Sequence, residues 1–209
     1  MDITQLILDD HYEQRRRFAM LEQMDPGDTA ALGAVWSQLA VFLEVHAAAE
    51  EQLFYPELLA AGLAGGATGT QTAEAETLDA IHDHNDIRDA VRAVADHEIG
   101  SAGWYAAVAA ANLANSDHMA EEEREGLTDF RRLASLQLRH DLAVAFVAYE
   151  ARHYAGVAPV DKDPEEYVRE EEEQQGLLGG GVLDARLPDG ADSGRSQGGS
   201  LSIGSLKPS

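Results

Sequence analysis

The stretch DHYEQR at residues 10–15 is matched later in the chain by DHNDIR at residues 83–88. Each copy is followed, about one long helix further on, by a histidine and two glutamates, in HAAAEE at 46–51 and HMAEEE at 118–123. The two histidines lie 35 residues apart in the first copy and 34 residues apart in the second. A duplicated helical hairpin is the simplest explanation of this repeat.

The repeated residues have the chemistry of metal ligands. Residues four apart on a helix differ by about 40° around its axis, so the histidine and first glutamate of each HxxxE point into the same space. One such pair is weak evidence, because both residue types are common on surfaces, but two copies in register are stronger. Buried carboxylates are costly unless a cation neutralises them. The predicted metal ligands are His11, His46, Glu50, His84, His118 and Glu122.

The neighbours of these ligands have other expected roles. Glu51 and Glu123 lie about 100° further round their helices, which predicts solvated side chains. The Asp of each DHxxxR copy is either a surface charge or a hydrogen-bond partner of a ligand. The Arg of each copy either pairs with a carboxylate near the site or forms a surface ion pair.

Apolar periodicity predicts an all-α fold. We expect a four-helix up-down-up-down bundle, an additional C-terminal helix and a disordered tail. The glycine-rich stretch 62–72 predicts a flexible link between the hairpins. The expected helices span residues 3–23, 29–61, 73–94 and 104–126, with the additional helix at 128–154.

The chain is expected to form one metal-binding domain, residues 1–157, followed by a flexible tail, residues 158–209. Residues 161–175 are a charge run and residues 176–209 are rich in Gly and Ser. Such composition buries too little apolar surface to offset the entropy of ordering. We therefore expect an acidic and then Gly/Ser-rich tail, in which only 165–175 could form a short exposed helix.

Charge and cysteine content exclude several functions. The formal net charge of −23 would repel nucleic-acid phosphates and anionic membrane surfaces, so neither partner is expected. The 209 residues contain no cysteine, which excludes disulfides, thiolate metal sites and cysteine nucleophiles. The start of the chain has no signal-peptide pattern, and no segment approaches 18 uninterrupted apolar residues, so a cytoplasmic protein is expected.

With these motifs the chain resembles the hemerythrin family, specifically the bacterial HHE cation-binding domains, over roughly residues 3–126. The resemblance rests on the two DH pairs, on HAAAEE with the following Phe54-Tyr55-Pro56, and on HMAEEE. It implies a non-haem centre of two Fe ions joined by an oxo or hydroxo bridge. In that centre Glu50 and Glu122 would bridge the irons, and the four histidines would be terminal ligands.

Two departures from the family pattern concern the remaining iron positions. Oxygen-carrying hemerythrins use five histidines, two of them four residues apart on the third helix. Here His82 and His84 lie about 200° apart on a helix, and the repeat together with the apolar Ile87 and Val91 favours His84. Tyr55 could fill a position only if a kink at Pro56 turned it from the opposite face.

The resemblance implies binding of, or reaction with, dioxygen, peroxide or nitric oxide. One histidine fewer than in the carriers leaves open positions on iron, which modestly favours reaction, such as peroxide consumption, over carriage. A non-catalytic oxygen or iron sensor, or an iron-handling module, is the alternative. Imidazole and carboxylate also suit manganese and zinc.

Overall fold

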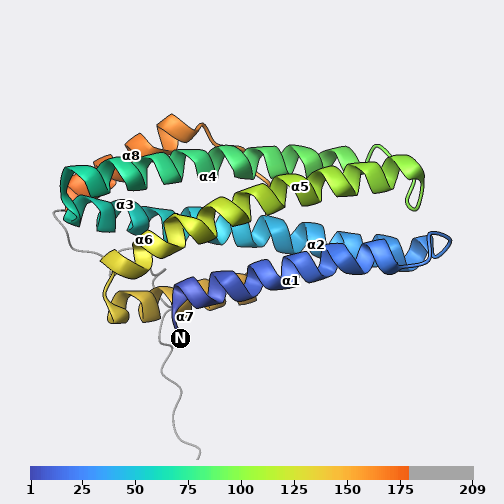
Figure 1. The fold of residues 1–209 in the computed structure, drawn as a ribbon, viewed down its shortest axis with the longest axis horizontal. Coiled ribbons are helices and arrows are strands. Elements are labelled where there is room, and N and C mark those ends of the chain that lie inside the picture. The colour runs from blue at the N-terminus through green and yellow to red at the C-terminus, as the bar shows by residue number, and fades with distance from the viewer. Residues whose placement is uncertain (179–209) are drawn as a thin grey trace, which may run out of the picture.

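A computed structural model describes residues 1–178, and this part of the chain is helical throughout, without strands (Figure 1). Most of the helices are connected by short turns, and the longer segment 153–163 connects the last two. In chain order they are α1 (Ile3–Gln23), α2 (Thr29–Ala49), the π-helical segment η1 (Glu50–Phe54), α3 (Tyr55–Ala64), α4 (Gly66–Val94), α5 (Ala102–Arg124), α6 (Gly126–Leu133), α7 (Leu136–Arg152) and α8 (Pro164–Leu178).

The long helices α1, α2, α4 and α5 lie side by side along the long axis of the molecule (Figure 1). Helix α2 runs through η1 into α3 without a turn, so these segments form one continuous rod. Helix α7 contacts α1 and α2, whereas α8 contacts α3 and α4. The predicted all-helical bundle is thus confirmed.

Caps explain where the first two helices begin. The Asp2 carboxylate accepts a hydrogen bond from the Thr4 backbone N–H at 3.0 Å. Asp28 caps α2 in the same way, through the Ala31 backbone N–H at 3.0 Å. Both caps satisfy N–H groups that have no partner within the helix.

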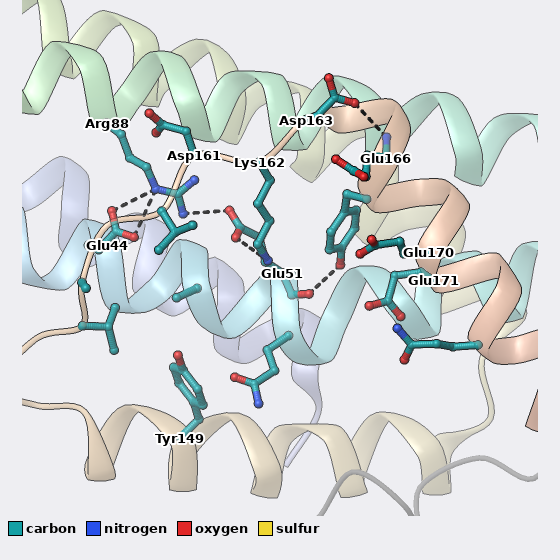
Figure 2. Close-up of a pocket in the computed structure, with 17 residues that line it drawn as sticks. Glu44, Glu51, Arg88, Tyr149, Asp161, Lys162, Asp163, Glu166, Glu170 and Glu171 are labelled. Atoms are coloured by element: carbon teal, nitrogen blue, oxygen red, sulfur yellow. Dashed lines mark hydrogen bonds and ion pairs between the residues drawn. The ribbon is translucent and has the colours of Figure 1, made fainter.

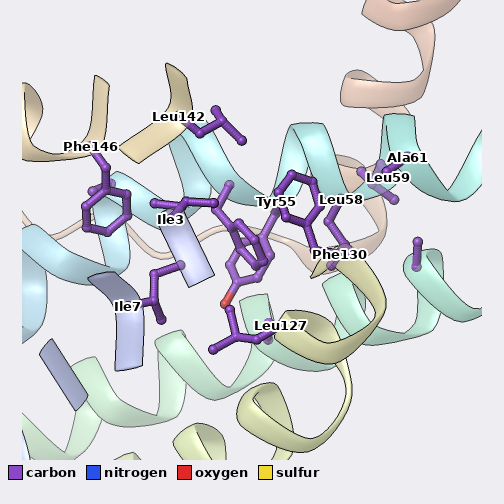
Figure 3. Packing of buried hydrophobic residues seen from close by; sticks show 14 of the residues in the cluster. Ile3, Ile7, Tyr55, Leu58, Leu59, Ala61, Leu127, Phe130, Leu142 and Phe146 are labelled. Carbon is purple, nitrogen blue, oxygen red and sulfur yellow. The ribbon is translucent and has the colours of Figure 1, made fainter. Parts of the chain in front are cut away.

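The hydrophobic core has two parts with a polar layer between them along the helices. One cluster gathers around Ile3, Tyr55 and Phe130 (Figure 3). The other cluster includes Phe18 and Trp104. The buried polar residues fall between these apolar stretches in the sequences of both α1 and α2. The polar layer is therefore enclosed at both ends by apolar side chains.

Two sequence predictions differ from the structure. The expected flexible link at 62–72 is helical except for a turn at Gly65, and Gly66 adopts a φ of 78° that suits glycine. The single helix expected at 128–154 is divided into α6 and α7. The break comes at Ala134, which is extended, and Ser135 caps α7 by accepting from the Leu138 N–H.

The expected flexible tail from residue 158 also differs from the structure in its first part. Helix α8 packs on the bundle and buries Tyr167 and Val168 in the core. These two apolar side chains interrupt an acidic run, and their burial holds the helix against α3 and α4. The Gly/Ser-rich remainder, 179–209, lies outside the described residues.

One stretch, Thr29–Ala64, is long and apolar enough to cross a membrane by length and composition alone. The core helix of a soluble bundle passes the same test, so this is weak evidence. The stretch also carries the buried charged residues Glu50 and Glu51 in η1. Its apolar residues supply both hydrophobic clusters, which accounts for its composition.

Candidate metal centre

The six predicted ligand residues converge in the polar layer, and all six side chains are buried. The first half of the repeat contributes His11 from α1, His46 from α2 and Glu50 from η1. The second half contributes one residue from α4 and two from α5, which are His84, His118 and Glu122.

Glu50 is shared by two groups that could each hold a metal ion. The first group is His11, His46 and Glu50, and the second is Glu50, His84 and His118. The Glu50 Oε1 atom lies 2.9 Å from His46 Nε2, and its Oε2 atom lies 3.3 Å from His84 Nε2. One carboxylate thus faces both halves of the repeat.

Glu122 completes the cluster from the other side. Its Oε2 atom lies 3.3 Å from His11 Nε2. Its Oε1 atom accepts a hydrogen bond from the Tyr55 hydroxyl at 2.9 Å. Glu122 therefore presents one oxygen to the imidazoles, while Tyr55 holds the other.

The second glutamate of each HxxxEE motif serves a histidine of the other half. Glu123 Oε1 lies 3.0 Å from His11 Nδ1, and Glu51 Oε1 lies 2.8 Å from His84 Nδ1. The prediction of a solvated side chain was therefore wrong for Glu51, which is buried, whereas Glu123 is still partly exposed although it contacts His11. The doubled glutamate in both copies was the signal for this role.

The aspartates of the DHxxxR motifs serve the remaining two histidines. Asp10 Oδ2 lies 3.4 Å from His46 Nδ1, and Asp83 Oδ2 lies 3.6 Å from His118 Nδ1. A carboxylate that pairs with Nδ1 fixes the orientation of the imidazole ring and leaves the Nε2 lone pair free to bind a metal. This is the usual arrangement of a metal-binding histidine. In this structure all four Nε2 atoms face the centre of the cluster.

The arginines of the motifs pair with the same glutamates. Arg15 lies 2.8 Å from Glu123, and Arg88 lies 2.8 Å from Glu51. Both pairs cross from one half of the repeat to the other. The repeated Asp, His, Arg and second Glu residues thus form one network. The aspartates support imidazoles of their own half, whereas the second glutamates and the arginines connect the two halves.

Without a cation, the carboxylates favour protonated imidazoles. Burial lowers the pKa of His84, but hydrogen bonds to Glu50 and Glu51 outweigh burial and raise this pKa to about 9. Burial raises the pKa of Glu51, but His84, Arg88 and Lys162 lower it to about 2. A bound cation would replace the imidazolium protons as the partner of these carboxylates.

A π-helical segment brings Tyr55 into the site. In a regular α-helix Tyr55 would lie about 180° from His46. The Tyr55 backbone N–H instead bonds to the Glu50 carbonyl, five residues back, and this extra residue in the turn rotates Tyr55 toward the face of Glu50. The predicted kink at Pro56 is thus not the cause, because the π-helix has already turned the chain.

The π-helix also explains how α8 docks (Figure 2). In the five-residue register the Glu51 carbonyl would accept from residue 56, but Pro56 has no N–H. The Tyr167 hydroxyl donates to this carbonyl at 2.5 Å. On the same side, Lys162 Nζ lies 2.9 Å from Glu51 Oε2, and Gln175 Nε2 donates to the Pro56 carbonyl at 2.6 Å. The C-terminal segment therefore covers the backbone that carries Glu50.

The other histidines lie apart from the cluster. His82 is largely exposed and lies 3.9 Å from Asp86, whereas His84 is buried, as the repeat predicts. The remaining three are His97 in an exposed turn, His140 next to the N-terminus and His153 bonded to the Tyr149 carbonyl.

One residue beside the cluster was not predicted from the sequence. Glu150 of α7 forms a third possible cation-holding group with Asp10 and His46. Burial and the neighbouring Asp10 raise the pKa of Glu150 to about 7. The sequence carries no signal for it, because α7 lies outside the repeat.

The donor set fits a metal ion. Among the described residues, several buried atoms of the cluster have no hydrogen-bond partner, namely His11 Nε2, His46 Nε2, both carboxylate oxygens of Glu50 and Glu122 Oε2. Unpaired buried polar atoms are rare and call for an explanation. Neutral imidazole nitrogens and carboxylate oxygens facing one another are suitable ligands for iron, manganese or zinc.

A helical bundle with a buried layer of imidazoles and carboxylates defines a metal-binding bundle protein. A family model, the hemerythrin HHE cation binding domain, matches residues 2–130. The chain belongs to this family. None of the curated proteins and none of the solved structures compared with the chain gave a match.

Proposed function

We propose that this protein holds two iron ions and reacts with peroxide, nitric oxide or dioxygen. The observation that carries the proposal is the position of Glu50, which belongs to both cation-holding groups. A carboxylate shared in this way suits a pair of ions rather than a single one. Two neighbouring irons joined by an oxo or hydroxo bridge would supply the redox chemistry for small oxygen or nitrogen ligands.

The proposed ligands are the six residues of the cluster, arranged in a four-helix up-down-up-down bundle. His11 and His46 would hold one ion, and His84 and His118 the other. Glu50 would join them, and Glu122 would add a carboxylate beside His11.

Residues around the ligands set the chemistry. The Nδ1 partners hold each imidazole with Nε2 toward the ions, and burial excludes bulk water. Tyr55 stays protonated, because burial and the nearby Glu122 and Glu50 raise its pKa well above 10. Its hydroxyl is therefore a hydrogen-bond donor at the site.

Ala80, rather than a fifth histidine, lies one turn before His84 on α4. No other described histidine approaches the cluster, so four imidazoles and two carboxylates leave coordination positions for an external ligand. Open positions favour reaction over simple carriage.

Peroxide consumption by the iron-loaded full chain tests the proposal. We expect turnover in the parent, loss of turnover and of iron in His84→Ala, and near-parental turnover in the control His82→Ala, because His82 is on the surface. If the parent holds iron and binds dioxygen reversibly but consumes neither peroxide nor nitric oxide, the alternative function of a carrier or sensor replaces this one. If His82→Ala is the variant that loses iron, the ligand assignment on α4 is wrong.

A further inference from the structure

A small cavity of about 30 Å³ lies against the second half of the metal centre. His118 and Glu122 form part of its buried inner wall, and the exposed carboxylates Asp79, Glu121 and Glu125 lie toward the surface. The cavity is large enough for about one or two water molecules. It thus connects the surface with the ligand side chains.

Carboxylates dominate the lining of this cavity. No lysine or arginine lines it, and its acidic residues are Glu76, Asp79, Asp83, Glu121, Glu122 and Glu125. Burial, Asp129 and Glu125 together raise the pKa of Glu76 to about 7. Crowded carboxylates with low-dielectric walls create a negative potential that concentrates cations.

The inner end of the cavity offers atoms that still lack a partner. Glu122 is only 6% exposed, and its Oε2 atom has no hydrogen-bond partner. Ala80, which also lines the cavity, leaves space where a larger side chain would fill the gap beside His118. A cation that reaches this end meets ligands that are ready to bind it.

The other cavities near the centre suit a cation less well. One of them, about 850 Å³, lies under α8 and ends at Glu51, whose carboxylate is already paired with Arg88 and Lys162 (Figure 2). A third cavity, about 220 Å³, reaches His84 but is lined mainly by apolar side chains between α2 and α4.

We propose that the acidic cavity is the route by which a divalent cation, ferrous iron in the first instance, enters the metal centre. Water molecules bound to the incoming ion are replaced by carboxylate oxygens of Glu76, Asp79 and Glu125. The ion then passes to His118 and Glu122. This inference rests on the proposed metal centre, and its test separates the two.

The rate of iron loading tests whether the negative charge of the cavity speeds the entry of iron. The metal-free full chain is mixed with Fe(II) without oxygen, quenched with a chelator at timed intervals, and its bound iron is counted. The test variant is Glu76→Gln/Asp79→Asn/Glu125→Gln. The control is Glu22→Gln/Asp96→Asn/Glu98→Gln, which replaces the same number of carboxyl groups, at exposed residues in and near the turns at the opposite end of the bundle (Figure 1).

We expect the test variant to bind iron about tenfold more slowly than the control at low salt. A tenfold change in rate is at the lower end of the range known for electrostatic steering. The difference should shrink at high salt, and both variants should reach the same final iron content. Equal loading rates would overturn the route but leave the metal centre intact. A parent that binds no iron would overturn the proposed function itself.

Gly126→Ala tests the same route without a change of charge. An added Cβ would lie 3.6 Å from Glu122 Cγ and 3.9 Å from Glu76 Oε2, which are ordinary contact distances, so the fold should tolerate it. The methyl group narrows the cavity between these side chains. We expect slower loading, and also slower release of iron from the loaded protein to a chelator, which needs no metal-free sample. Unchanged rates in both directions would rule out this cavity as the path.

Discussion

The two halves of the repeat supply matching candidate ligands, but they differ in how deeply the supporting charges are buried. In the first half, Glu51 is 2% exposed and its partner Arg88 is 3% exposed. In the second half, Glu123 is 27% exposed and its partner Arg15 is 41% exposed. Helix α8 and Lys162 cover Glu51 and its neighbours. The repeat thus specifies the ligands, whereas elements outside the repeat specify their burial.

A second difference is the helix that carries each glutamate. Glu50 and Glu51 lie in the π-helix η1, whereas Glu122 and Glu123 lie in the regular helix α5. Glu50, at the start of the π-helix, belongs to both groups of imidazoles, and the π-helical turn brings Tyr55 toward Glu122. The first half is therefore expected to dominate metal binding.

The largest expected effect compares the two ligand carboxylates. Glu50→Gln should lose both irons, because both cation-holding groups share this residue. Glu122→Gln should keep at least part of its iron, since neither of these two cation-holding groups includes Glu122. Metal analysis of both purified variants checks this. Similar iron content in the two variants would mean that the halves contribute equally.

The next largest effect compares the two supporting glutamates. Glu51→Gln removes a buried carboxylate that pairs with both Arg88 and His84, so we expect a loss of about 3–5 kcal/mol in the free energy of unfolding. Glu123→Gln breaks a partly exposed pair and should cost about 1 kcal/mol or less from the ion pair. Denaturant unfolding of the metal-free variants measures both. Equal losses would contradict the difference in burial.

The pH dependence of the metal-free protein is a related test. The folded-state pKa of His84 is about 9, above its ordinary 6.5, so its stabilising contribution is complete below pH 6.5 and is lost as the pH rises to about 9. The slope from this one group is at most about 1.4 kcal/mol per pH unit. His11 and His46, whose pKa values are also raised, act in the same direction. Unfolding measured across this pH range should show falling stability, and a rising profile would contradict the assigned contacts.

The smallest effect concerns helix α8, which covers Glu51 in the first half of the repeat. Tyr167→Phe removes the donor to the Glu51 carbonyl and should cost about 1–3 kcal/mol, because a buried acceptor loses its partner. Tyr154→Phe, at a largely exposed position, is the matched control and should be neutral. If both variants melt at the same temperature, α8 does not support η1 through this hydrogen bond.

Much of the centre could be predicted from the sequence, because the ligands recur at helical spacing. The repeat favours His84 over His82, and the structure buries His84 and leaves His82 largely exposed. The solvated role expected for Glu51 was wrong, whereas Glu123 is still partly exposed. The position of a residue around its own helix does not show what a neighbouring helix contributes. In the structure, a neighbouring helix brings His84 to Glu51, and another brings His11 to Glu123.

The parts that could not be predicted depend on contacts between distant segments. The π-helix at Glu50–Phe54 has no pattern that a regular 3.6-residue period would detect. The position of Tyr55 follows from that segment. Tyr167 and Val168 stand alone in an acidic run, so only their packing against the bundle reveals their role.

The most direct test of the central claim is the number of iron ions bound by the full chain. The chain is loaded with iron, freed of excess metal and measured by metal analysis, with an optical spectrum recorded with and without azide. Two converging groups that share Glu50 predict two irons per chain and an absorption band that azide changes. A folded chain that holds one iron, or none, would contradict the claim that the two halves together form a centre for two ions.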